Sequence, residues 1–166
     1  RLAERLADEP VDAGWVSDLQ RARQTAAPWA TRRALVLRAD ARWREQSFGE
    51  IEGMKVHTLH VEHPGLWARW AEHDADFGLP GGESARQFHA RILAALQALG
   101  EAHPRERVLL VTHGGVLDML WRTATGESLH GLVEVLNTQV QAANWALPPM
   151  PLQTEAPRGP GPSPLH

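Results

Sequence analysis

The sequence contains no cysteine among its 166 residues, which excludes disulfide bonds, thiolate catalysis and metal sites built on thiolates. It also has no apolar run near the roughly 20 residues that a membrane-spanning helix needs. The formal net charge is only −3, so neither a nucleic-acid surface nor a polybasic membrane patch is indicated. We therefore expect no nucleic-acid partner and no membrane contact. We also expect a cytoplasmic location, because no export signal is visible in these residues.

Length and composition indicate one globular domain. Hydrophobic residues make up 43% of the chain and charged residues 22%, which are ordinary values for such a domain. Tyrosine is absent although tryptophan occurs seven times, and we have no functional interpretation of this bias. Proline is concentrated at the end of the sequence, so we predict a domain over residues 1–147 and a disordered, proline-rich tail over residues 148–166.

Short apolar runs alternate with amphipathic segments along this domain. The runs at Ala13–Ser17, Ala34–Arg38 and Arg107–Thr112 predict buried strands, and a further strand is expected near residues 138–145. Strands that alternate with helices predict an α/β fold, a three-layer sandwich with a mostly parallel central sheet flanked by helices. The predicted helices cover residues 1–8, 18–33 with Asp18 as the N-cap, parts of 54–76, a segment from 85 that Gly100 closes, and 116–126.

Several residues that bear useful chemistry are predicted at one edge of this sheet, where α/β proteins place their sites. Arg21 lies in the first turn of the helix after the first predicted strand, and His113 directly follows the strand that ends before it. Gly114 and Gly115 open the next helix, where free N–H groups and the helix dipole attract an anion. This convergence predicts a bound phosphoryl group, with Glu45 from a loop as a candidate general acid.

Each of these residues also has an ordinary structural interpretation when taken alone. Arg21 would be a solvated helix residue, and Glu45 would be one of several exposed loop glutamates. Four segments in order nevertheless give the chain a specific pattern, which resembles the histidine phosphatase superfamily, a group that also contains cofactor-dependent phosphoglycerate mutases. The segments are S-D-L-x-R-A-x-Q-T at Ser17–Thr25, R-E-x-x-F-G-E-x-E-G at Arg44–Gly53, P-G-G-E-S at Pro80–Ser84 and V-T-H-G-G at Val111–Gly115.

The resemblance implies a phosphoglycerate mutase-like fold whose pocket of two histidines and two arginines holds phosphate. Arg21 matches the second pocket arginine, and His113 matches the second pocket histidine, with Gly114 beside the phosphoryl group. Glu45 lies four residues before Gly49, where the family has the carboxyl group that protonates the leaving oxygen. In the family one histidine attacks phosphorus and becomes phosphohistidine, and neither a metal nor an organic cofactor takes part.

The attacking histidine of the family belongs to an Arg-His-Gly motif at the end of the first strand, and no Arg-His-Gly occurs in these residues. We therefore expect an N-terminally truncated member that lacks this motif and strand and is inactive as it stands. The family otherwise implies a hydrolase of small phosphorylated metabolites, with a metabolite or inorganic phosphate as its partner. Substrate and oligomeric state stay undetermined.

Two alternatives to a hydrolase stay open. One is a non-catalytic pseudo-phosphatase that binds phosphate compounds or a partner, and the other is a mutase-type phosphotransferase. The mutases generally carry a larger insertion over the pocket, whereas only roughly 26 residues separate Gly53 from Pro80 here. This comparison favours the hydrolase.

The segment between those residues carries two further patterns. His57, His60 and His63 recur every three residues, so two of them would meet on a helix and suit a metal ion. We favour a solvated, pH-sensitive helix face, since no fourth ligand is evident. Trp67 and Trp70 would either form an apolar lid against a substrate or pack the helix, and packing is the favoured interpretation.

Overall fold

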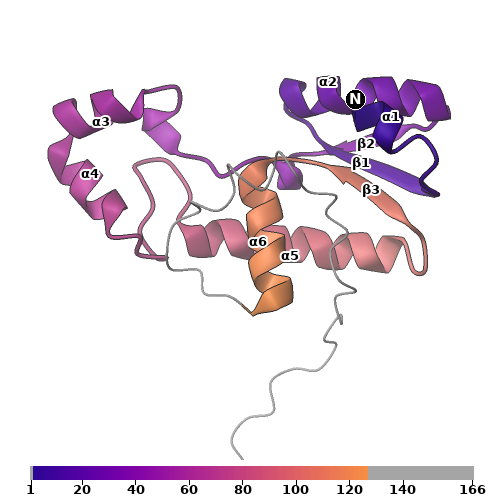
Figure 1. Ribbon diagram of the computed structural model, residues 1–166. Coiled ribbons are helices and arrows are strands. Elements are labelled where there is room, and N and C mark those ends of the chain that lie inside the picture. Colours follow the sequence, from indigo (N-terminus) through magenta and orange to yellow (C-terminus); the bar gives the residue numbers. More distant parts are fainter. Residues whose placement is uncertain (1, 127–166) are drawn as a thin grey trace, which may run out of the picture.

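A computed structural model describes residues 2–126 of the chain, and within them three parallel strands form one open sheet in the order β2-β1-β3. Helices lie on both faces of this sheet (Figure 1), with α1 and α2 on one face and α5 and α6 on the other. The predicted parallel α/β sandwich is confirmed. The elements are α1 Leu2–Arg5, β1 Ala13–Ser17, α2 Gln20–Arg33, β2 Leu37–Asp40, the 3-10 turns η1 Ala41–Trp43 and η2 Gly49–Ile51, α3 Val56–Glu62, α4 Pro64–Ala71, α5 Ala85–Ala102, β3 Val108–Val111 and α6 Gly114–Thr125.

The two faces of the sheet bury separate cores because side chains alternate along a strand. In β3, Leu109 and Val111 point towards α2, whereas the intervening Leu110 packs against α5 and α6. Burial of apolar side chains on both faces of a strand is typical of a parallel sheet covered by helices. The larger core consists of Trp43, Phe88, Ile92, Ala95, Val116, Met119 and Leu120.

Several predicted boundaries were wrong. The second strand is Leu37–Asp40 rather than Ala34–Arg38, because Ala34 ends α2 in the left-handed conformation with φ of 49°. The first helix ends at Arg5, before the predicted stop near Pro10, and turns follow it. The expected strand at residues 138–145, the tail and the last part of the expected domain lie outside the described residues.

Two predicted helix ends also differ. Gly100 does not close α5, which continues to Ala102. His103 ends the helix instead, because its ring bonds to the Trp15 indole at 2.9 Å and to Glu106 at 2.7 Å. Asp18 is not the N-cap of α2, since that position belongs to Leu19, which has no capping side-chain bond.

Helices α3 and α4 form a lobe beside the sheet (Figure 1). Pro64 follows the end of α3 and occupies the first turn of α4, where its missing N–H costs nothing. The loop that leads into this lobe packs tightly on the P-G-G-E-S segment. Gly49 has φ of +61°, and a Cβ there would overlap the Pro80 carbonyl oxygen, so only glycine fits. No helix in residues 2–126 combines the length and the apolar character that crossing a membrane requires.

Candidate active site

The parallel sheet brings the ends of β1 and β3 together at one edge. Ser17 is the last residue of β1, and His113 stands at the N-cap of α6, two residues after β3. The His113 Nε2 atom and the Ser17 Oγ atom share a hydrogen bond of 2.7 Å. Both side chains are buried, with exposed fractions of 8% for His113 and 0% for Ser17. The imidazole is therefore held firmly at the sheet edge.

Three charged side chains surround this imidazole. Burial lowers the pKa of His113, and the positive charge of Arg21 lowers it further. The carboxylates of Glu45 and Asp18 oppose that effect without cancelling it. The structure thus brings the charges of Arg21 and Glu45 within electrostatic reach of His113, and the net effect favours the neutral imidazole.

The Glu45 carboxylate is oriented by backbone N–H groups. Gly115 N–H, in the first turn of α6, donates to Glu45 Oε2 at 3.0 Å, and Gln46 N–H donates to Glu45 Oε1 at 3.0 Å. A Cβ on Gly115 would overlap Glu45 Oε1 and would lie 3.1 Å from Glu45 Cδ and 3.3 Å from Phe88 Cε1. A larger residue at this position would therefore push the Glu45 carboxylate out of its hydrogen bond with this N–H group. By contrast, a Cβ on Gly114 would meet no atom within 4 Å.

Arg21 differs from the other charged residues of this region. Its side chain is exposed in the first turn of α2 and makes no hydrogen bond or ion pair with the residues described here. It lines a cavity of about 640 Å³ together with Glu45 and Arg44. A guanidinium without a protein partner in a cavity is suited to bind an anion.

Arg44 and Asp18 form an ion pair that the sequence did not reveal. Arg44 Nε donates to Asp18 Oδ1 at 2.7 Å, and its terminal nitrogen donates to Oδ2 at 2.6 Å. These hydrogen bonds lower the pKa of the Asp18 carboxyl group. The pair explains why Asp18 does not cap α2, and it balances the positive charge of Arg44 at the cavity wall.

Arg91 and Glu83 together hold the backbone of the Glu45 loop, which we define as residues 42–47. Arg91 of α5 donates to the carbonyl oxygens of Arg42 at 2.7 Å, Arg44 at 3.1 Å and Glu45 at 3.3 Å. It also donates from two nitrogens to the two carboxylate oxygens of Glu83, both at 2.7 Å. We call this arrangement the Arg91–Glu83 brace. Sequence reasoning missed it, although Glu83 belongs to the P-G-G-E-S segment.

Glu83 and Thr112 also bind the backbone around the Glu45 loop. Burial acts to raise the pKa of Glu83, but hydrogen bonds from Arg91 and from the Ser47 N–H outweigh it and hold the pKa below its ordinary value. Thr112, next to His113, donates its hydroxyl to the Trp43 carbonyl at 2.7 Å. The general-acid candidate is thus carried by a loop tied to α5 and to the end of β3.

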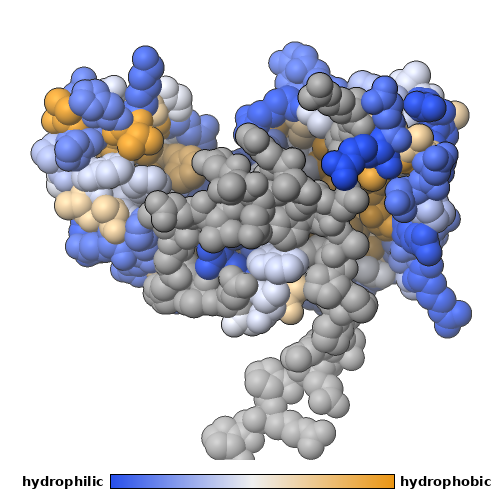
Figure 2. Space-filling view, viewed as in Figure 1, coloured by the Kyte–Doolittle hydropathy of each residue, from blue (hydrophilic) through white to orange (hydrophobic). Residues whose placement is uncertain are grey.

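The cavity extends from the charged residues to the α3–α4 lobe. Figure 2 shows a hollow between this lobe and the α2 side, with apolar surface gathered over the lobe. Trp70 lines the cavity, and Trp67 packs against it with ring centroids 5.5 Å apart. Apart from Leu19, the apolar lining residues, which we call the apolar wall, are Phe48, Ile51, Met54, Val56, Leu59 and Trp70.

The three histidines of the lobe do not form a metal cluster. Within residues 2–126, no group of three His, Cys, Asp or Glu side chains is arranged to hold a metal ion. His57 and His60 lie on α3, and His63 separates α3 from α4. The His60 ring packs edge-on against Trp67, with centroids 5.5 Å apart.

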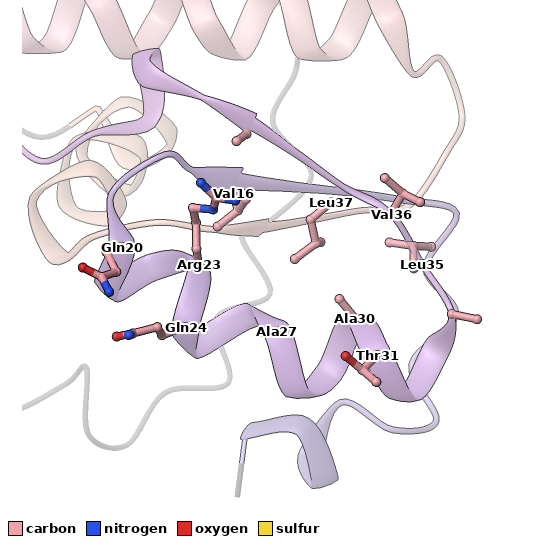
Figure 3. Close-up of a pocket in the computed structure, with 12 residues that line it drawn as sticks. Val16, Gln20, Arg23, Gln24, Ala27, Ala30, Thr31, Leu35, Val36 and Leu37 are labelled. Carbon is pink, nitrogen blue, oxygen red and sulfur yellow. The ribbon is translucent and has the colours of Figure 1, made fainter.

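A second cavity of about 640 Å³ lies between α2 and β2 and is separate from the candidate site (Figure 3). Its lining includes Arg23 but none of Arg21, Glu45 and His113. It therefore has no part in the arrangement described above. Figure 3 labels Val16, Gln20, Arg23, Gln24, Ala27, Ala30, Thr31, Leu35, Val36 and Leu37 around it.

Comparison with known proteins finds a match to the histidine phosphatase superfamily (branch 1) over residues 1–146. The chain is 34% identical over 143 residues to phosphoglycerate mutase-like protein 4 of Arabidopsis thaliana, which covers 84% of this chain and 62% of that protein. It is 33% identical over 149 residues to a metal-independent phosphoserine phosphatase of the same plant, which covers 86% of this chain and 60% of that protein.

A solved structure is also similar. The mycobacterial glucosyl-3-phosphoglycerate phosphatase in complex with inorganic phosphate superposes with a TM-score of 0.67 at 31% identity, covering 76% of this chain and 65% of that one. The chain thus spans about 60% of the length of the two plant relatives. The family match over residues 1–146 spans the positions of all four motifs identified in the sequence.

Proposed function

The chain belongs to the histidine phosphatase superfamily, and from this premise we propose that Arg21, Glu45 and His113 form the phosphoryl-binding part of a phosphomonoester hydrolase. The substrate is a small phosphorylated metabolite. The observation that carries the proposal is the guanidinium of Arg21, which lacks a partner among the described residues and lies in one cavity with Glu45. Its charge also reaches the buried His113 imidazole.

The proposed roles follow from the charge of a phosphoryl group, whose oxygens carry the negative charge that a site must stabilise. Arg21 donates two N–H groups to these oxygens, and His113 donates one from its ring. The first turn of α6, which begins at Gly114, adds the positive end of a helix dipole. Glu45, held by the Gly115 and Gln46 N–H groups, would have to be protonated first and would then give that proton to the leaving oxygen of an ester.

The step that breaks the ester needs a nucleophile. The family resemblance assigns this role to the histidine of an Arg-His-Gly triplet, and the triplet does not occur in the 166 residues. We therefore propose that these residues bind phosphate without turning over an ester. Arg21 in the cavity would also serve the second candidate, a non-catalytic domain that binds phosphate compounds. The mutase-type phosphotransferase stays an alternative, because one relative is named phosphoglycerate mutase-like protein 4.

Isothermal titration of the 166-residue chain with inorganic phosphate tests the pocket. Arg21→Ala should weaken binding about 10- to 100-fold, the effect of losing hydrogen bonds to a charged group. Arg23→Ala is the matched control, because Arg23 lies on the same helix but lines the other cavity. Equal affinity in the wild-type chain and Arg21→Ala would refute the proposed pocket.

A turnover assay tests the second part of the proposal. We expect no release of p-nitrophenol from p-nitrophenyl phosphate by the 166-residue chain. Clear hydrolysis that is abolished by His113→Ala would show that these residues supply their own nucleophile.

A further inference from the structure

The candidate phosphate site occupies one end of a cavity whose remaining lining is mostly apolar. Arg21 and Glu45 mark the charged end, and the apolar wall continues from the Glu45 loop to Trp70 on α4. A phosphate ester bound to Arg21 therefore has to place the rest of its substituent near this wall. This geometry concerns the part of the substrate that does not react.

Part of the apolar wall is open to solvent. Val56 is 59% exposed, and Ile51 and Trp70 are half-buried. Apolar surface left in contact with water favours a ligand that covers it, at about 25 cal/mol for each Å² buried. Leu59, by contrast, is 3% exposed and belongs to the packed interior of the lobe.

The charges around the cavity argue against a second anionic group on the substrate. The described lining contains three arginine or glutamate residues besides Arg21, namely Arg44, Glu45 and Glu52. Asp18 already neutralises Arg44 through two hydrogen bonds. Glu52 adds a carboxylate to the lining, and its Oε1 atom accepts hydrogen bonds from the Ser47 hydroxyl and the Phe48 N–H. A carboxylate on the substrate would therefore find no unpaired cation in this lining once Arg21 holds the phosphate.

We propose that the site selects phosphomonoesters whose other substituent is an apolar, uncharged aryl or alkyl group, held against Trp70, Ile51 and Val56. This inference rests on the proposed function, because Arg21 must hold the phosphate first. It assigns the exposed apolar wall a role in substrate selection.

Titration calorimetry with three phosphonates, which are not hydrolysed, tests this selection on the 166-residue chain. Phenylphosphonate should bind roughly tenfold or more tightly than methylphosphonate, the usual effect of filling an apolar pocket. Phosphonoacetate, which carries a carboxylate, should bind more weakly than methylphosphonate. Trp70→Ala should reduce the ratio of phenylphosphonate to methylphosphonate affinity to near one, with circular dichroism confirming that the variant is folded.

A matched pair on α3 provides a test that does not depend on Trp70. Val56→Ser should lower the affinity ratio, whereas Val61→Ser should leave it unchanged. The two valines lie on the same helix and are exposed to 59% and 61% respectively, but only Val56 lines the cavity. Both substitutions affect exposed side chains, so both variants should fold.

The outcomes separate this inference from the proposed function. Equal affinities for phenylphosphonate and methylphosphonate would overturn the apolar selection. So would a ratio of these two affinities that stays the same in both Trp70→Ala and Val56→Ser. The phosphate pocket would still stand if Arg21→Ala abolished binding in the same assay. Failure of every phosphonate and of inorganic phosphate to bind would remove both.

Discussion

The Arg91–Glu83 brace can be tested by Arg91→Met, which retains most of the aliphatic stem and removes the guanidinium. The variant loses two charge-assisted hydrogen bonds to Glu83 and three bonds to carbonyl oxygens of the Glu45 loop. It also leaves the Glu83 carboxylate without its cation. The loop would then be held by its bonds to Glu83 and, through Trp43, to Thr112. The Arg44–Asp18 ion pair and the bond between Glu45 and the Gly115 N–H would also remain.

The expected loss of stability depends on how deeply the Arg91–Glu83 pair is buried. Bonds to a charged group contribute about 1.5–3 kcal/mol each, and removing one partner of a fully buried pair costs about 3–5 kcal/mol. The side chains of Arg91 and Glu83 are each 23% exposed, so water screens the pair and rehydrates the carbonyl groups. We expect the free energy of unfolding to fall by about 2–3 kcal/mol, which lowers Tm by roughly 5–10 °C for a chain of this length.

Urea titration and thermal melts followed by circular dichroism measure this loss, and amide exchange of the Ser47 N–H reports the loop locally. Arg86→Met is the matched control, because Arg86 also lies on α5 and also binds a carboxylate through two nitrogens. Its pair with Asp76 is exposed to 56% and 64%, so this control should melt like the wild type. Equal losses in the two variants, or none in Arg91→Met, would refute the reasoning.

Two further predictions concern the site itself. Gly115→Ala should lower the free energy of unfolding by about 1–3 kcal/mol, because its Cβ overlaps Glu45 Oε1, whereas Gly114→Ala should not lower it; urea melts in which both variants lose stability equally would contradict the contact. Burial lowers the pKa of His113 in the folded chain. As the pH falls, the unfolded chain therefore takes up a proton on this imidazole first, near pH 6.5. The stabilising contribution of His113 should be full above that pH and should decline from pH 6.5 towards pH 5. His113→Gln should remove part of this decline and leave the part due to His89, whose pKa is also lowered by burial; an unchanged slope in urea melts would refute the assignment.

Local patterns in the sequence predicted the main frame of this protein. The apolar run at Ala13–Ser17 is a strand with the predicted bounds. The run before His113 is a partly buried strand, trimmed by one residue at each end. Parallel strands joined by helices end at one edge, so the pattern also predicted that Arg21 and His113 would lie near each other. The cytoplasmic location and the catalytic roles of the site residues stay predictions.

Helix ends were predicted less well because they depend on contacts with other elements. Gly100 has the residue type that ends many helices, yet α5 continues until His103 meets Trp15 of β1. Asp18 has a favourable capping side chain, but its carboxylate instead accepts two hydrogen bonds from Arg44, which is 26 positions away in the sequence. In both cases a hydrogen bond to a residue far away in the sequence outweighed the local preference.

The sequence by itself determined β1 and β3, the layered fold and the identities of the residues that follow these two strands. Apolar periodicity and strand direction act within single segments, so a short stretch of sequence is enough to predict them. Only the tertiary structure showed that Gly115 holds Glu45 across 70 positions, that Arg91 supports the same loop, and that Trp70 lines the cavity. These contacts join segments whose relative placement depends on how the cores pack. No spacing within one segment encodes that placement.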